Sequence, residues 1–440
     1  MQRDLAQATV PNTPASASMP MRPPRTEVGV LGWLRHNLFS SWGNALLTVV
    51  ALYIVWRLLD GVVSWGVVNA VWSGDDGKAC SEGSGACWAF IRAKFSQFVY
   101  GRYPDEERWR VDLVYALALA GLVPLMVPRV PGKAWSAGFT LLIFPVVAFW
   151  LLTGSASGAG TGSLDVAGFV LGLVGIASLL LGRSGLRLVG VLCLAVAVPL
   201  FMRWVFSTSG LVQLPAVPTE LWGGLLVTLV VASVGITGSF PVGIALALGR
   251  RSKMPFARWA SIGFIEFVRG VPLITVLFMA SVMLPLFLPA GVSFDKLLRA
   301  LVGVALFAGA YMAETIRGGL QAIPRGQFEA AEALGLSYPQ RMALIILPQA
   351  LKLVIPGIVN SFVGLFKDTS LVLIIGLFDV LGIVKLNLTD AKWFANSTTM
   401  TGYVFAGFVF WVFCFGMSRY SQMIERRLAT GHERGAVKAG

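Results

Sequence analysis

The chain has 440 residues, of which 56% are hydrophobic and 13% are charged, and its mean hydropathy is +0.74. A soluble domain carries about twice that share of charged residues, so the composition predicts an integral membrane protein. The formal net charge of +13 is assigned to basic loops on one side of a membrane, because the chain has no soluble basic face on which a nucleic acid could bind.

The chain begins with a segment rich in Pro, Ala, Ser and Thr, and we expect residues 1–42 to form a disordered cytoplasmic tail. No cleavable signal peptide is predicted, because the first long apolar run starts only after Trp42 and is too long for one. About ten apolar segments follow, each close to the length of a membrane-spanning helix, so the predicted fold is all-α. The predicted spans are 43–68, 111–128, 135–153, 165–182, 186–206, 221–248, 268–289, 297–316, 353–375 and 401–418.

Basic residues in the short loops set the orientation. They fall on one side if the N-terminus is cytoplasmic, and they are Arg22, Arg25, Arg35, Arg129, Lys133, Arg183, Arg187, Arg250, Arg251, Lys253, Arg258, Arg419, Arg426 and Arg427. Both termini are then cytoplasmic. One long loop, 69–110, is assigned to the outside although it contains Arg92, Lys94, Arg102, Arg108 and Arg110.

Cysteine and histidine are scarce. Cys80 and Cys87 lie close together in loop 69–110, where an oxidising periplasm allows a disulfide; two free thiols are the alternative. The two histidines, His36 and His432, lie near opposite ends of the chain, so neither a metal site nor a histidine-based catalytic triad is predicted.

The polar interval 317–352 lies between two apolar segments and predicts a helix–turn–helix. A short run of strong helix formers precedes Gly335, which stands where a helix C-terminus favours a positive φ. Ser337 can cap a second helix, with Pro339 in its first turn and Gln340 completing a capping box.

The first of these two helices suits contact with another protein. Glu329 and Glu332 share one face and can meet basic partners, and Ala330, Ala331 and Ala333 allow close approach. Helix propensity alone favours the alternative, an ordinary cytoplasmic loop that is helical.

The order of residues in this interval resembles the EAA motif of the inner-membrane permease subunits of bacterial ABC importers. The positions that fill the motif are Glu329, Ala330, Ala331, Gly335, Ile345, Leu347 and Pro348. In that family the loop is a coupling helix that docks into a cleft on the ATP-binding subunit. From Leu221 onward the chain resembles the polar-amino-acid importer permeases, and its long N-terminal extension is similar to that of the general L-amino-acid permease subunits.

The resemblance implies a domain order. We expect an N-terminal transmembrane extension of about five helices at 43–210 with a periplasmic loop 69–110, then a type I ABC importer core of five helices at 221–418. The coupling loop 317–352 lies within that core, and 419–440 forms a cytoplasmic C-terminal tail.

Ionisable residues at membrane depth are candidates for function. Glu266 with Arg269, and Glu314 with Arg317, have the spacing of ion pairs on one helix face, so a structural pair and contact with substrate both remain open. The string Lys367, Asp368, Thr369 and Ser370 resembles the family's signature at the translocation path, and Asn360 extends its polar face. Lys367 and Asp368 must line a cavity, pair with neighbours or mark a break in the helix.

No phosphate-binding loop for ATP is present, so if ATP drives this protein, another chain must bind it. We expect that the chain itself catalyses no reaction and needs no cofactor. The resemblance implies four partners in a bacterial inner membrane: an ATPase dimer, a second permease subunit related to this one, a periplasmic amino-acid-binding protein and an L-amino acid. The alternative is an ion-coupled secondary transporter, which usually has an internal repeat that we do not find here. An integral-membrane enzyme is disfavoured by the scarcity of histidine.

Overall fold

The computed structural model describes residues 30–127, 130–154, 163–181, 214–289 and 294–436, with short stretches between 190 and 205. The chain divides into two compact units, which are described separately. One comprises Met1–Ala70 with Ser84–Ala86, and the other Val71–Gly83 with Cys87–Gly440. The predicted disordered tail lies largely outside the described residues.

The first unit is built on one long apolar helix. A short helix α1 (Val30–Asn37) precedes α2 (Trp42–Val63), which continues as a π-helical turn, η1 (Ser64–Val68). The Ser41 hydroxyl oxygen accepts a hydrogen bond from the Asn44 N–H at 3.2 Å and so caps α2. No residue of α2 is buried within the protein, as expected for a helix that lipid surrounds.

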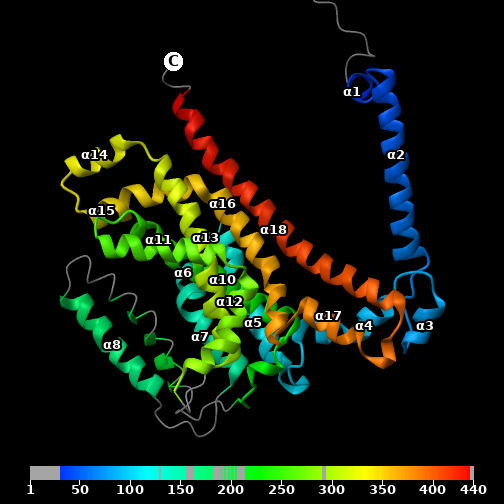
Figure 1. Cartoon of the computed structure of the whole chain (residues 1–440), viewed down its shortest axis with the longest axis horizontal. Coiled ribbons are helices and arrows are strands. Elements are labelled where there is room, and N and C mark those ends of the chain that lie inside the picture. Colours follow the sequence, from blue (N-terminus) through cyan, green and yellow to red (C-terminus); the bar gives the residue numbers. More distant parts are fainter. Residues whose placement is uncertain are drawn as a thin grey trace, which may run out of the picture. The chain divides into compact units, whose positions relative to one another are not determined.

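The second unit is a bundle of membrane-spanning helices (Figure 1). Its spans, with their component helices, are Asp105–Met126 (η2 Asp105–Glu107, α5 Arg108–Met126), Lys133–Thr153 (α6 Lys133–Gly138, η3 Phe139–Ile143, α7 Phe144–Thr153), α10 (Gly224–Arg250), α13 (Lys296–Ala322), Tyr338–Ile375 (α15 Tyr338–Arg341, η7 Met342–Ile346, α16 Leu347–Asp368, η8 Thr369–Ile375) and α18 (Asn396–Ala436). With α2 and η1, seven helices among the described residues are long and apolar enough to cross a membrane.

The predicted number of ten spans stays a prediction. Helix α8 (Ser163–Leu181) corresponds to the predicted span 165–182, whereas the predicted span 186–206 lies mostly outside the described residues. The predicted span 268–289 is broken. Helix α11 (Pro255–Gly270) and the run Leu273–Phe287, made of α12 (Leu273–Phe278), η5 (Met279–Met283) and η6 (Leu284–Phe287), meet at 105°.

Helices α10, α13 and α16 form the centre of the bundle, and glycines allow their close approach (Figure 1). A Cβ at Gly243 would lie 2.6 Å from Met312, and one at Gly319 would lie 2.6 Å from the Ala350 carbonyl oxygen. One continuous hydrophobic cluster joins α10 and α13 to α5 and α7, so these two N-terminal helices pack directly on the C-terminal ones.

A cap of short elements covers the end of the bundle where α10 starts. It contains α3 (Gly77–Glu82), α4 (Trp88–Tyr100), η4 (Thr219–Leu221), the two-residue strand β1 (Phe378–Asp379), α17 (Val380–Leu388) and η9 (Ala391–Trp393). Cys80 and Cys87 are joined by a disulfide and are buried in a cluster with Phe90, Val384 and Trp393. Loop 69–110 is therefore largely a packed helical layer.

This packing accounts for the basic residues of loop 69–110, which is assigned to the outside although basic loops usually lie on the cytoplasmic side. Of the five basic residues named above for loop 69–110, four bind acceptors on the protein. These are Lys94 with Asp390 (2.6 Å), Arg102 with the Glu220 carbonyl (2.8 Å), Arg108 with Asp105, and Arg110 with Glu107 (2.6 Å) and the Pro215 carbonyl (2.8 Å). Arg92 is exposed.

Candidate functional site

A short polar element projects where α13 ends and α15 begins (Figure 1); we call residues 324–341 the polar hook. It consists of α14 (Arg325–Ala333), a turn and α15. Gly335 has φ +70°, and its N–H donates to the Glu332 carbonyl at 2.9 Å, while the Leu336 N–H donates to the Ala331 carbonyl at 3.3 Å. These two bonds form a Schellman motif, which ends α14 at the predicted glycine.

The second helix of the hook also starts where the sequence predicts. Gln340 Oε1 accepts hydrogen bonds from the Ser337 N–H at 3.0 Å and from the Ser337 hydroxyl at 2.8 Å. Pro339 lies in the first turn. Unlike a separate loop helix, α15 continues through η7 into α16, so the hook joins a membrane-spanning helix without a break.

Three side-chain contacts hold α14 to three other helices. Glu332 pairs with Arg341 of α15 at 2.9 Å, and the Gln349 amide of α16 donates to Gln327 Oε1 at 3.2 Å. The guanidinium of Arg251, which follows α10, lies over the Phe328 ring at 5.4 Å from its centroid. These contacts fix the direction in which the outer face of α14 points.

That outer face combines acidic, small and apolar residues. Glu329, Ala330 and Ala333 are exposed, and Leu334 is 74% exposed. Ala331, expected to permit close approach of a partner, is instead only 1% exposed, because it lies on the inner face of α14 one turn after Phe328. Ala330 and Ala333 are therefore the small residues that can allow a partner protein to approach α14 closely.

The remaining motif positions lie further along. Gly335 and Pro348 are exposed, whereas Ile345 and Leu347 are partly buried. Ile345 and Leu347 pack against the buried cluster that joins α13 to α16. They anchor the base of the hook and do not contribute to its outer face.

A cluster of five ionised side chains lies beside the hook, at the ends of α10, α11 and α13; we call it the ion cluster. Its contacts are Arg250 with Glu266 (2.9 Å) and with Glu314 (3.5 Å), Arg269 with Glu314 (3.8 Å), and Arg317 Nε with Glu314 (2.8 Å). The ion pair between Glu314 and Arg317, predicted from their three-residue spacing, is present. Glu266 contacts Arg250, and Arg269 contacts Glu314, so these two residues join different helices instead of each other.

The second candidate group lies at the other end of α16. The α-helix ends at Asp368 and tightens into the 3-10 helix η8, so the Lys–Asp pair marks a change of helix type. The Thr369 hydroxyl donates to the Phe366 carbonyl at 2.8 Å and Thr369 is buried, which gives it a structural role. The Ser370 hydroxyl donates to the Lys367 carbonyl at 2.9 Å.

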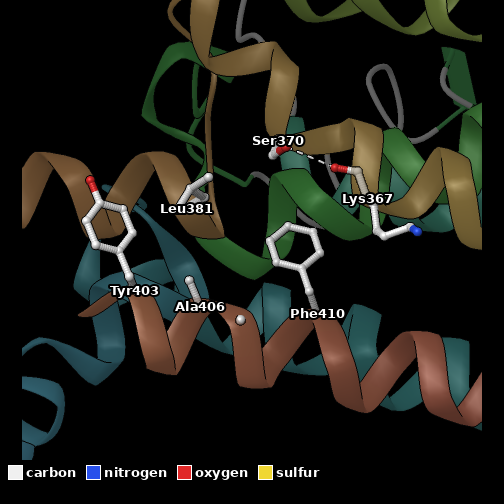
Figure 2. Close-up of a pocket in the computed structure, with 7 residues that line it drawn as sticks. Lys367, Ser370, Leu381, Tyr403, Ala406 and Phe410 are labelled. Atoms are coloured by element: carbon white, nitrogen blue, oxygen red, sulfur yellow. Dashed lines mark hydrogen bonds between the residues drawn. The ribbon is translucent and has the colours of Figure 1, made fainter. Parts of the chain in front are cut away.

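Lys367 and Ser370 border a cavity of about 300 Å³ (Figure 2). Leu381 of α17 and the α18 residues Tyr403, Ala406, Gly407 and Phe410 complete its lining. On α16, Asn360, Gly364 and Lys367 follow one another at helical spacing. Asn360 and Lys367 are exposed, and a Cβ at Gly364 would meet no atom within 4 Å. This polar stripe of α16 is thus open along the helix.

The candidate residues therefore form two groups instead of one. Glu266, Arg269 and Glu314 gather beside the hook, while Lys367 and Asp368 lie at the far end of α16. Gly357 of α16 lies against Thr315, the neighbour of Glu314, and Lys367 follows ten residues later, about 15 Å further along the helix. Sequence reasoning missed Arg250 as the residue that joins Glu266 to Glu314, because it was counted only as a loop charge. Among the described residues, no three His, Cys, Asp or Glu side chains come together as a metal site.

Comparison with known proteins gives a family match. Residues 239–430 match the family described as "Binding-protein-dependent transport system inner membrane component". The chain is 46% identical over 399 residues to the "Inner membrane amino-acid ABC transporter permease protein YhdY" of Escherichia coli (strain K12), covering 91% of this chain and 93% of that protein. It is 43% identical over 435 residues to the "Glutamate/glutamine/aspartate/asparagine transport system permease protein BztC" of Rhodobacter capsulatus, covering 94% and 97%.

A solved structure titled "Crystal structure of an amino acid ABC transporter with histidines" is 28% identical. It covers 46% of this chain and 92% of its own, with a TM-score of 0.41.

Proposed function

Because this chain belongs to the inner-membrane permeases of binding-protein-dependent amino-acid ABC transporters, we propose that its polar hook is the element through which a separate ATPase drives transport. The chain is a multi-pass inner-membrane protein and an amino-acid permease. The hook end of the bundle then faces the cytosol and the cap faces the periplasm.

The observation that carries this proposal is the outer face of α14. Glu329, Ala330, Ala333 and Leu334 are exposed there, while the inner face is tied to α10, α15 and α16. A face of small and acidic residues on a braced helix suits insertion into a cleft of another protein, with basic residues opposite Glu329. Movement of that cleft when ATP closes the ATPase dimer would turn α14 and the helices attached to it.

The polar stripe of α16 supports a transport path. Asn360 and Lys367 lie on an open face of a membrane-spanning helix, where exposure to lipid is unfavourable, so we propose that a second permease subunit covers it. An amino acid carries an ammonium and a carboxylate, and the adjacent Lys367 and Asp368 offer charges of both signs. Binding of ATP would shift the pair of subunits between states open to either side.

The cap is the proposed contact for a periplasmic binding protein. A polar hollow of about 340 Å³ opens there, bordered by Asp75, Lys94 and Lys392 among others. The Lys94 ammonium donates a hydrogen bond to Asp390 and holds the pKa of that carboxyl below its usual range. The cap thus presents a fixed pattern of charges.

The test is a charge reversal in the assembled transporter. Glu329→Lys should reduce ATP-driven uptake of an L-amino acid into vesicles at least tenfold, because a reversed charge at an interface costs several kcal/mol, while insertion into the membrane is unchanged. Glu106→Lys is the matched control, because Glu106 is exposed near the start of α5, at the cap end. Uptake by Glu329→Lys at the wild-type level, at equal expression, would remove the hook from the coupling step.

A further inference from the structure

Helix α11 carries an apolar stripe that nothing in the described structure covers. Phe256 is 86% exposed, Trp259 73% and Phe267 67%. Ala260 and Gly263 lie between them and are also exposed. At 100° per residue these positions fall within one stripe along the helix.

The opposite side of the helix is the one that packs on the protein. Ser261, Ile265 and Val268 are buried there, against α10 and α13. The charged residues of α11 occupy a flank between these two sides, with Arg258 early in the helix and Glu266 and Arg269 later. The helix thus has a protein side, a charged flank and an outward apolar stripe.

The direction of α11 excludes an ordinary membrane span. It has 16 residues, too few to cross a bilayer, and includes three charged side chains. It meets the following apolar run, Leu273–Phe287, at 105°. If that run points across the bilayer, α11 lies nearly parallel to the membrane surface.

Basic residues accompany the stripe at its N-terminal end. Lys253 and Arg258 are both exposed, and neither contacts an acidic side chain among the described residues. An aromatic stripe with basic residues beside it is the pattern of helices that lie in the interface of an anionic membrane.

We propose that α11 is a membrane-surface helix, with Phe256, Trp259 and Phe267 in the acyl boundary of the leaflet at the hook end and with Lys253 and Arg258 on anionic phospholipid headgroups. The cytoplasmic identity of that leaflet rests on the proposed function, but the depth of the helix does not. Since Glu266 and Arg269 of α11 belong to the same ion cluster as Arg317, this contact anchors the base of the hook to the lipid surface.

Spin-label accessibility in the reconstituted complex tests the depth. Cys193 and Cys414 are replaced by Ser, and single nitroxides are placed at 256, 259, 263 and 267 in phosphatidylcholine vesicles containing phosphatidylglycerol. All four should collide more often with oxygen than with a water-soluble nickel chelate, and a label at Arg258 should show the reverse. Preference for nickel at the four positions, or shielding from both reagents by another protein, overturns the proposal.

The headgroup contact has its own measurement. As phosphatidylglycerol is titrated into phosphatidylcholine vesicles, the label at 256 should move deeper. The double variant Lys253→Gln/Arg258→Gln should weaken the apparent affinity for phosphatidylglycerol by up to about twenty-five-fold, roughly fivefold for each basic side chain, and so raise the phosphatidylglycerol fraction at the half-point. Arg92→Gln, at the exposed cap arginine, is the control and should not move it. An unchanged half-point in the double variant overturns the headgroup contact, whether or not transport depends on the hook.

Discussion

The turn in the polar hook depends on one backbone conformation, so Gly335→Ala should loosen the hook without touching any other side chain. Gly335 has φ +70°, and a Cβ there would meet no atom within 4 Å, so no steric clash with neighbours contributes. The cost is that of placing an L-residue in the left-handed region, about 1–2 kcal/mol. This corresponds to a roughly 5–30-fold rise in the open population of the turn.

Hydrogen exchange read by mass spectrometry on peptides from 325–346 measures that population in the purified protein. The amides to follow are those of Gly335 and Leu336, which donate to Glu332 and Ala331. Their protection should fall about 5–30-fold in Gly335→Ala and less in Gly335→Asn, because Asn tolerates this conformation better.

Gly326→Ala is the matched control for the same helix. Gly326 lies in α14 with ordinary φ and open space around it, so an alanine there should preserve or increase protection. Equal protection in Gly335→Ala and the wild type would refute the role of this turn. An equal loss in both variants would show that α14 is sensitive to any side chain.

Three further predictions concern the bundle and the cap. Gly319→Ala should lower stability in detergent by about 1–3 kcal/mol, because its Cβ would lie 2.6 Å from the Ala350 carbonyl oxygen. Gly318→Ala is the control and should leave stability unchanged, because a Cβ there meets no atom within 4 Å. Equal melting temperatures for the two variants would contradict the close packing. Burial raises the pKa of the Asp379 carboxyl to about 6 in the folded protein, whereas its pKa in the unfolded chain is about 3.9. Between these two pH values the folded state keeps a proton that the unfolded chain releases. The stability from this group is therefore present below about pH 4 and lost as pH rises to about 6, and Asp379→Asn should remove that slope from melting curves taken between pH 4 and 7. The unreduced protein should yield a peptide linking Cys80 to Cys87 by mass spectrometry, and reduction should cost about 2–3 kcal/mol; free thiols in the unreduced chain would exclude the bond.

Local signals in the sequence predicted the hook well. Gly335 and the Ser337–Gln340 capping box act over a few residues, and the structure places each of them where the pattern requires. The seven spans found among the described residues were predictable because each needs about 20 apolar residues, a property of composition.

The direction of a helix and the ion pairs between residues far apart in the sequence could not be predicted in the same way. A hydropathy window joins the end of α11 to α12, since it records apolar content and not the 105° bend between them. The three-residue spacing of Glu266 and Arg269 suggested a pair, but Arg250 competes for Glu266 from 16 positions away in the sequence. The burial of Ala331 was hidden for the same reason, because it depends on which face of α14 turns inward.

The bracing of α14 by Arg251, Arg341 and Gln349 has a mechanical consequence. A load applied to this helix is divided between the end of α10 and the start of α16, so neither of them moves alone. A movement of the ATPase against α14 would thus displace both spans together. Removing any one of the three side-chain contacts would weaken the coupling between α14 and the spans but would not abolish it.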